Sequence, residues 1–361
     1  MTDAPEARSA AKTPRLGLWL AGLTALAVIV YAGWWFAAAG LLKGEAERWI
    51  AGQEQDGFTL AHAAPVVAGF PGKITVTYAD WSFTAPTTRG GGTWRTPHVE
   101  VSAEPWSPLR FTVDLSGTHT ISGVWTPLDA PATVTATRAV MQPRLTTEGR
   151  IGELNVEIKE LLVGGVAPSP ALAGLEDGAL LIARDDKADT PTWRITLALT
   201  NWHAPAIENP TGFGPNIRAM HFDADLKGAL PTGTLPEALN AWREGGGTLE
   251  VRTFAFDWPP LSVAATGTFA LDEKLQPVGA LTATFAGFSE TLSALAQDNT
   301  INRDNADAAQ TVLNLLARKP EGGGPPELRI SVTVQNSRLY LGPVPLTDVP
   351  QVQWPQDLKL P

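Results

Sequence analysis

Cysteine is absent from the 361 residues of this chain. Its absence excludes disulfides, zinc–thiolate sites and thiol nucleophiles. A chain without cysteine tolerates an oxidising compartment without mispairing, so the absence is compatible with export but does not demonstrate it. Basic residues are also few, with 27 Lys and Arg against 37 Asp and Glu. Sequence-independent nucleic-acid binding needs a basic face that replaces phosphate counterions, so we do not expect nucleic acid as a partner.

Recognisable catalytic motifs are missing as well. The chain has no Walker loop, no G-x-S-x-G elbow, no H-E-x-x-H and no G-x-G-x-x-G. Asp223 and Asp225 share one strand face, but the alternate positions are apolar, so we expect both carboxylates to face outward. The five histidines lack the close pairing typical of metal sites: His62, His98, His119, His203 and His221. We therefore expect a protein that is not an enzyme and has no metal or cofactor.

Charge is absent between residues 16 and 42, which read LGLWLAGLTALAVIVYAGWWFAAAGLL. Spanning the hydrocarbon core of a bilayer takes about 20 residues, so this run is long enough for a transmembrane helix. Arg8, Lys12 and Arg15 precede it, and the positive-inside rule then places the N-terminus in the cytoplasm.

A cleaved signal peptide is the alternative to an anchor. Residues 37–39 are three alanines that would suit a cleavage site. The apolar region of a signal peptide is usually about 7–15 residues long, and this run is longer. We therefore predict an uncleaved anchor in the inner membrane, crossing once, with the bulk of the chain in the periplasm.

The remaining chain is predicted in consecutive parts. Residues 1–15 form a cytoplasmic tail, 16–42 the transmembrane helix, 43–57 a juxtamembrane helix and 58–361 an extracytoplasmic β-rich domain. In 43–57, apolar residues at helical spacing indicate that the helix continues along the membrane surface or under the following domain.

Period-two alternation of apolar and polar residues dominates the β-rich part and is typical of half-buried strands. It is clearest in residues 109–115, 192–200 and 328–334. One-sided alternation favours antiparallel pairing. The pattern recurs in residues 73–83, 98–103, 132–137, 154–159, 217–227, 248–256, 261–271 and 278–285. The fold class is therefore mainly β, with a large curved antiparallel sheet that forms either a groove or a sandwich.

Helical patterns after the anchor are few. We predict helices near 235–242 and 289–318, the second broken around 299–302. Proline and glycine cluster in residues 168–178. This cluster allows a sub-boundary within the domain, but we favour a long turn within one sheet system.

Three segments resemble a known family. Gly69-Phe70-Pro71 opens an alternating strand (GFPGKITVTYADWSF). Residues 265–287 read as a strand, an Asp turn and a P-x-G strand before a helix, and residues 336–346 read as a closing hairpin. With the Trp-rich anchor, they resemble the alphaproteobacterial envelope proteins grouped as domain of unknown function 2125, over nearly the whole chain. Taken alone, the Gly-Phe-Pro motif also fits a plain turn with Phe70 buried at the start of the sheet.

A more distant resemblance is to AsmA-like envelope proteins. Those have an N-terminal anchor and a long curved sheet whose concave apolar side conducts or holds lipid. The resemblance implies a role in lipid or outer-envelope homeostasis and carries over no catalytic residue.

Two functions follow as hypotheses. The first is a membrane-anchored module that binds or transfers lipid or another apolar molecule, with membrane lipids as partners. A curling sheet would leave a groove lined by Val99, Val101, Phe111, Val113, Ile195 and Leu197. A closed sandwich core built from the same residues is the alternative, and periodicity does not decide between them.

The second hypothesis is a structural or scaffolding envelope protein that acts through protein partners. Tryptophan is enriched at interface hot spots, and several tryptophans lie beside prolines or in turns. The candidate anchors are Trp81, Trp94, Trp106, Trp125 and Trp258.

Overall fold

The computed structural model describes residues 15–123, 130–165, 171–185, 187–203, 213–298, 301–319, 323, 325–342, 344–356 and 358–360. Its first element is one long helix, α1 (Arg15–Gln55). The helix runs without a break through the ranges predicted as a transmembrane and a juxtamembrane helix. By length and composition it is apolar enough to cross a membrane.

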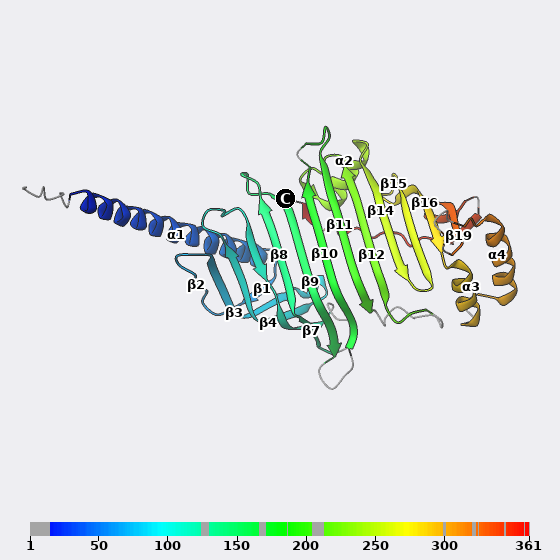
Figure 1. The fold of residues 1–361 in the computed structure, drawn as a ribbon, viewed down its shortest axis with the longest axis horizontal. Coiled ribbons are helices and arrows are strands. Elements are labelled where there is room, and N and C mark those ends of the chain that lie inside the picture. The colour runs from blue at the N-terminus through cyan, green and yellow to red at the C-terminus, as the bar shows by residue number, and fades with distance from the viewer. Residues whose placement is uncertain are drawn as a thin grey trace, which may run out of the picture.

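The two halves of α1 have different surroundings. Residues 19–30 are exposed all round, and the first half projects from one end of the body (Figure 1). Contact begins at Tyr31, and the second half packs against β1 (Thr59–Ala61) and β3 (Ile74–Ala85). The helix is therefore both a projecting rod and a part of the folded core.

After α1 the described chain is mainly β, as predicted, and 18 of its strands belong to one antiparallel sheet. Besides β1 and β3, these strands are β2 (Val66–Ala68), β4 (Gly92–Ala103), β5 (Phe111–Asp114), β6 (Gly117–Gly123), β7 (Ala132–Ala136), β8 (Arg138–Leu145), β9 (Ile151–Gly165), β10 (Ala171–Arg184), β11 (Thr192–His203), β12 (Ile217–Lys227), β14 (Thr248–Trp258), β15 (Leu261–Leu271), β16 (Pro277–Ala286), β17 (Glu327–Gln335), β18 (Arg338–Leu341) and β19 (Val344–Asp348).

Two patterns of pairing build the sheet. From β9 to β19 each strand of the sheet pairs with the next one along the chain. Nearer α1, a long strand is faced by two short ones end to end: β1 and β2 along β3, β5 and β6 along β4, and β7 and β8 along β9. In Figure 1, β3 and β4 turn away from the row β8–β16 and lie beside α1, so the sheet curves around the helix.

Short helices lie at the ends of the strands. α2 (Leu235–Glu244) connects β12 to β14, and the Glu237 carboxylate accepts the backbone N–H of Thr234 at its start (3.0 Å). α3 (Phe288–Gln297) and α4 (Arg303–Leu316) pack on each other beyond β16. These positions confirm the helices predicted near 235–242 and 289–318.

The C-terminal segment runs back along the turns of the sheet. The Gln276 side chain bonds the backbone of Val352 in both directions, at 2.8 and 3.2 Å. The Trp354 indole donates to the carbonyl of Leu275 (2.8 Å). A two-stranded pair, β13 (Gly233–Thr234) with β20 (Lys359–Leu360), ends the chain beside α2.

The prediction of a long turn around residues 168–178 was wrong. Residues 171–178, expected to be a long turn, form the first half of β10, and residues 168–170 lie outside the described residues. The strand forms because β9 and β11 pair with it on both sides and satisfy its backbone groups. The sheet therefore continues through the region where a sub-boundary was considered.

Candidate functional site: the apolar face of the sheet

A single row of apolar side chains crosses the sheet. Directly paired residues point to the same face, and the pairing links an apolar residue on each of twelve strands, from β3 to β17. At about 4.8 Å between strands, the row is roughly 50 Å long. This apolar row consists of Val76, Val101, Val113, Met141, Val156, Leu180, Leu197, Phe222, Phe254, Ala265, Ala283 and Ile330.

The apolar row belongs to a wider apolar face. On β11 the face also carries Ile195, which pairs with Ile182 and Ala224. On β4 and β5 it carries Val99 and Phe111, each two residues from the row member on the same strand. All six predicted lining residues therefore lie on one face of one sheet.

Under α1 this face is a packed core. Val76 is 0% exposed, and it clusters with Tyr78, Val99 and the helix residue Ile50. Val101 and Val113 pack against the same cluster. The helix therefore occupies the part of the face where three of the six lining residues lie, Val99, Val101 and Val113, and Val99 in particular is buried in the protein's own core.

Away from α1 the same face is packed unevenly, and its small residues Ala224, Ala265 and Ala283 are buried. Leu180, Leu197 and Phe222 are only half-buried, although they continue the row that begins at Val76. Among the described residues, both hydrophobic core clusters contain α1 residues. The apolar face therefore has a cover at one end, and its middle strands keep apolar side chains partly open.

The opposite face is charged and internally paired. Arg252 contacts Asp223 at 2.6 Å and Asp225 at 3.3 Å, and Arg194 contacts Asp225 at 3.3 Å. The hydrogen bond to Asp223 raises the pKa of the Arg252 guanidinium. The outward orientation predicted for both aspartates is confirmed. Their carboxylates serve as ion-pair partners on the polar face.

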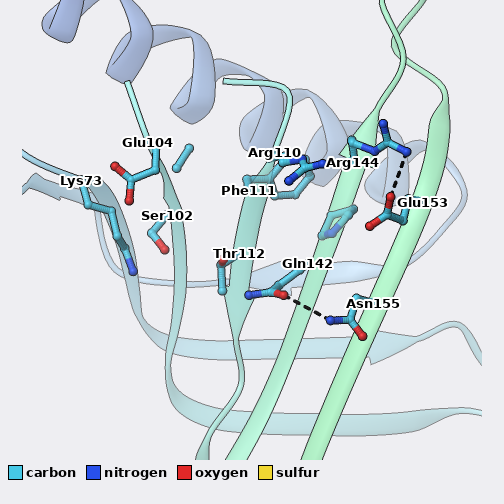
Figure 2. A pocket seen from close by; sticks show the side chains of 12 residues that line it. Lys73, Ser102, Glu104, Arg110, Phe111, Thr112, Gln142, Arg144, Glu153 and Asn155 are labelled. Carbon is cyan, nitrogen blue, oxygen red and sulfur yellow. Dashed lines mark hydrogen bonds and ion pairs between the residues drawn. The ribbon is translucent and has the colours of Figure 1, made fainter. Parts of the chain in front are cut away.

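A polar cavity of about 240 Å³ opens on this charged face (Figure 2). Gln142 and Asn155 bond across it at 3.3 Å, and Arg144 and Glu153 form an ion pair at 2.8 Å. Phe111 reaches its lining from the strand end. Four of the polar side chains that line the cavity are therefore paired with one another.

Helix α1 is joined to the body through three aromatic donors. The Trp35 indole donates to the carbonyl of Gly72 (2.7 Å), the Trp34 indole to Pro105 (3.0 Å) and the Tyr31 hydroxyl to Pro71. Indole and hydroxyl donors in this arrangement fix the rotation of α1 about its axis relative to the turn at residues 69–72.

Phe70 belongs to this junction and is not buried. Its ring is 48% exposed and lies 5.5 Å from the Trp35 ring and 5.8 Å from the Phe36 ring. Burial at the start of the sheet was therefore the wrong interpretation. The Gly-Phe-Pro motif instead contacts the helix, which sequence reasoning missed because the partner residues lie about 35 positions earlier.

The tryptophans proposed as interface anchors differ widely. Trp81 is buried, the Trp94 indole donates to His119 (3.3 Å), and the Trp258 indole donates to Gly214 (2.8 Å). Trp106 is 70% exposed, and Trp125 lies outside the described residues. Of the described four, Trp106 alone offers most of its ring to solvent.

Within the part of the chain that the structure describes, no group of three or more His, Asp or Glu side chains lies close enough to hold a metal ion.

Comparison with known proteins gives one match. No curated protein and no solved structure matches the chain, so the likeness to AsmA-like proteins stays a prediction. The family described as an uncharacterized protein conserved in bacteria (DUF2125) matches residues 35–350. The match begins at Trp35, a fully buried residue of α1, and extends through β19. The chain therefore belongs to the DUF2125 family of bacterial proteins.

Proposed function

We propose that α1 anchors this protein in the inner membrane, and that the body, in the periplasm, holds or transfers a lipid or another apolar molecule along the apolar face without catalysing a reaction. The observation that carries the proposal is the apolar row, which crosses twelve strands and leaves Leu180, Leu197 and Phe222 half-buried in its middle, outside both hydrophobic clusters that contain α1 residues.

The physical argument is the cost of leaving such a face in water. Each square ångström of apolar surface exposed costs about 25 cal/mol, and contiguous exposed apolar patches beyond a few hundred Å² usually mark interaction sites. The side chains of the row carry no hydrogen-bonding groups, so an acyl chain satisfies them without polar partners. A lipid is therefore the occupant that the chemistry favours.

The packing of α1 supports an uncleaved anchor. Trp35, Ala38 and Ala39 are buried against Ile74 of the body. Cleavage at the alanines of residues 37–39 would remove Trp35 from this cluster and expose Ile74. Retention of the helix keeps the core intact.

A matched pair of variants tests the lipid proposal. Leu180→Asn with Leu197→Asn places two amides opposite each other on the apolar face. Leu181→Asn with Thr196→Asn makes the same change one residue along, on the polar face. Full-length protein is purified, and its lipid is extracted and quantified by mass spectrometry. We expect lipid in the wild type, a several-fold loss in the first variant and no change in the second.

Two results would contradict the proposal. One is a wild-type protein that carries no lipid and binds no fluorescent lipid. The other is equal lipid in both double variants, with circular dichroism showing that each remains folded.

A scaffolding function is the second candidate, and the exposure of Trp106 favours it. A photo-crosslinking residue at position 106 would capture a protein partner in intact cells. Recovery of the same partner in repeated experiments, lost in Trp106→Ala cells, would support scaffolding. Absence of a reproducible partner would count against it.

A further inference from the structure

The length of α1 sets the level of the membrane surface. At 1.5 Å per residue, the roughly 30 Å of a hydrocarbon core takes about 20 helical residues. Counted from Leu16, that length ends near Trp35, close to where the body first contacts the helix at Tyr31. With α1 across the bilayer, the turn at residues 69–72 lies at the membrane surface. Residues 36–55 of the helix then lie outside the hydrocarbon core, on the same side of the membrane as the body.

An apolar pocket lies at this level, between α1 and β2. It has a volume of about 320 Å³, within the range of ligand sites, roughly 300–1,000 Å³. Its lining includes Phe36, Ala39 and Gly40 on the helix and Val67 and Phe70 on the other side. A Cβ at Gly40 would meet nothing within 4 Å, so the glycine leaves this side of the pocket open.

The two ends of the pocket differ in polarity. Phe36 and Phe70 stack at 5.8 Å at the end nearer the membrane, and both rings are exposed. Lys43 lies two helical turns farther from the membrane and also lines the pocket. Its ammonium group is 3.5 Å from Glu47 and remains partly open to solvent.

This polarity matches a phospholipid in the leaflet on the body's side of the membrane. Its acyl chains point toward the bilayer centre and its phosphate points away. We propose that the pocket binds one anionic glycerophospholipid, with the acyl chain between Phe36, Phe70 and Val67 and the phosphate at Lys43. This site rests on the membrane anchoring in the proposed function. It would let the body bind one lipid molecule at the membrane surface.

Photolabelling of the full chain tests the site. The protein is placed in nanodiscs of phosphatidylglycerol with a diazirine in the acyl chain, and labelled peptides are mapped after illumination. We expect label on residues 66–70 as well as on the exposed helix residues 19–30. Gly40→Trp fills the pocket and should lower the label on 66–70 at least fivefold, without changing that on 19–30.

Leu41→Trp is the matched control, because Leu41 is 58% exposed and does not line the pocket. It should leave the label on 66–70 within twofold of wild type. Equal labelling of 66–70 in the Gly40→Trp and wild-type proteins would overturn the site, since general contact with the bilayer would then explain the label.

The phosphate contact has its own test. Lys43→Glu should lower the label from phosphatidylglycerol more than that from phosphatidylcholine, whereas Lys43→Arg should keep both. The effect should be smaller than that of Gly40→Trp, because Glu47 already shares the ammonium group. An unchanged label from phosphatidylglycerol in Lys43→Glu would overturn the assignment of the phosphate, and an equal loss of label from both lipids would overturn the preference for an anionic lipid.

The same samples separate this site from the proposed function. Loss of lipid in the Leu180→Asn/Leu197→Asn protein, together with Gly40-independent labelling of 66–70, would overturn the pocket alone. A wild-type protein with no lipid on its sheet but with Gly40-dependent labelling would overturn the proposed function alone.

Discussion

Glycines at positive φ have unequal roles in this protein. Gly69 has φ +104°, and a Cβ there would lie 1.9 Å from the carbonyl oxygen of Lys73. Gly117 has a similar φ of +116°, but a Cβ there would meet nothing within 4 Å. An alanine at either position would be strained by the positive φ, but only an alanine at position 69 would also clash with the backbone. The two substitutions together therefore separate backbone strain from steric clash.

We predict that Gly69→Ala destabilises the protein more than Gly117→Ala does. Backbone strain alone costs of order 1–3 kcal/mol and applies to both, whereas the clash with Lys73 applies to Gly69 only. Urea unfolding of the full chain in detergent, followed by tryptophan fluorescence, measures the difference. Equal urea midpoints for the two variants would show that the turn at residues 69–72 shifts to accommodate the added Cβ without a loss of stability.

Asp114 makes stability depend on pH. Burial acts to raise the pKa of its carboxyl, but hydrogen bonds from Ser116 (backbone N–H to Oδ1, 2.8 Å) and the charge of Arg138 outweigh it, and the pKa is lowered. A carboxyl whose folded pKa lies below its ordinary value, near 3.8, stabilises the protein above that value. The contribution is lost as pH falls through the folded pKa.

We therefore predict that Asp114→Asn flattens the acid side of the stability curve. Urea midpoints measured between about pH 2.5 and 6 should fall less steeply in the variant than in the wild type. Ser116→Ala removes the side-chain bond but keeps the backbone bond, so it should give an intermediate slope. Parallel curves for all three proteins would contradict the role of this carboxyl.

At the scale of elements, α1 depends on the aromatic junction for its position. Trp35 is buried, and its indole donates to Gly72 at 2.7 Å. Trp35→Phe keeps a ring and removes the donor, so it should cost about 1 kcal/mol. Trp35→Ala also opens a cavity and should cost about 3–5 kcal/mol.

Unfolding of the full chain in urea measures both changes. Trp19→Phe is the control, because Trp19 lies on the projecting part of α1, exposed to its surroundings, and should leave the midpoint unchanged. If Trp35→Ala costs no more than Trp19→Phe does, the helix does not contribute to the folded core.

The orientation of the whole molecule can be tested through its lack of cysteine, because any introduced thiol is then unique. Glu273→Cys places a thiol on an exposed turn of the body, and Ser9→Cys places one in the N-terminal segment. We predict that a membrane-impermeant maleimide labels position 273 in cells with a permeabilised outer membrane. Position 9 should react only after the inner membrane is opened. The reverse pattern would place the body in the cytoplasm.

Local sequence predicted most strands because their pattern is local. Residues 217–227 and 261–271 coincide with β12 and β15, since alternation shows directly which residues share a face. It failed for β10, where Gly174, Gly178 and the neighbouring prolines read as a turn. Strand β10 forms because β9 and β11 bond its backbone on both sides. That pairing depends on the arrangement of the whole sheet and not on the residues of β10 alone.

The candidate site, like the fold, depends partly on local sequence and partly on tertiary structure. Sequence alone determined the apolar helix, the mainly β body and the shared face within each strand, of Val99 with Val101, Phe111 with Val113 and Ile195 with Leu197, because each depends on composition or on a period of a few residues. That the three strands present these residues on one face of one sheet follows from their pairing. Only the tertiary structure decided which part of that face α1 buries and which part stays half-open. The reason is that burial depends on contacts between segments far apart in the chain, such as Ile50 with Val99, and no local pattern records them.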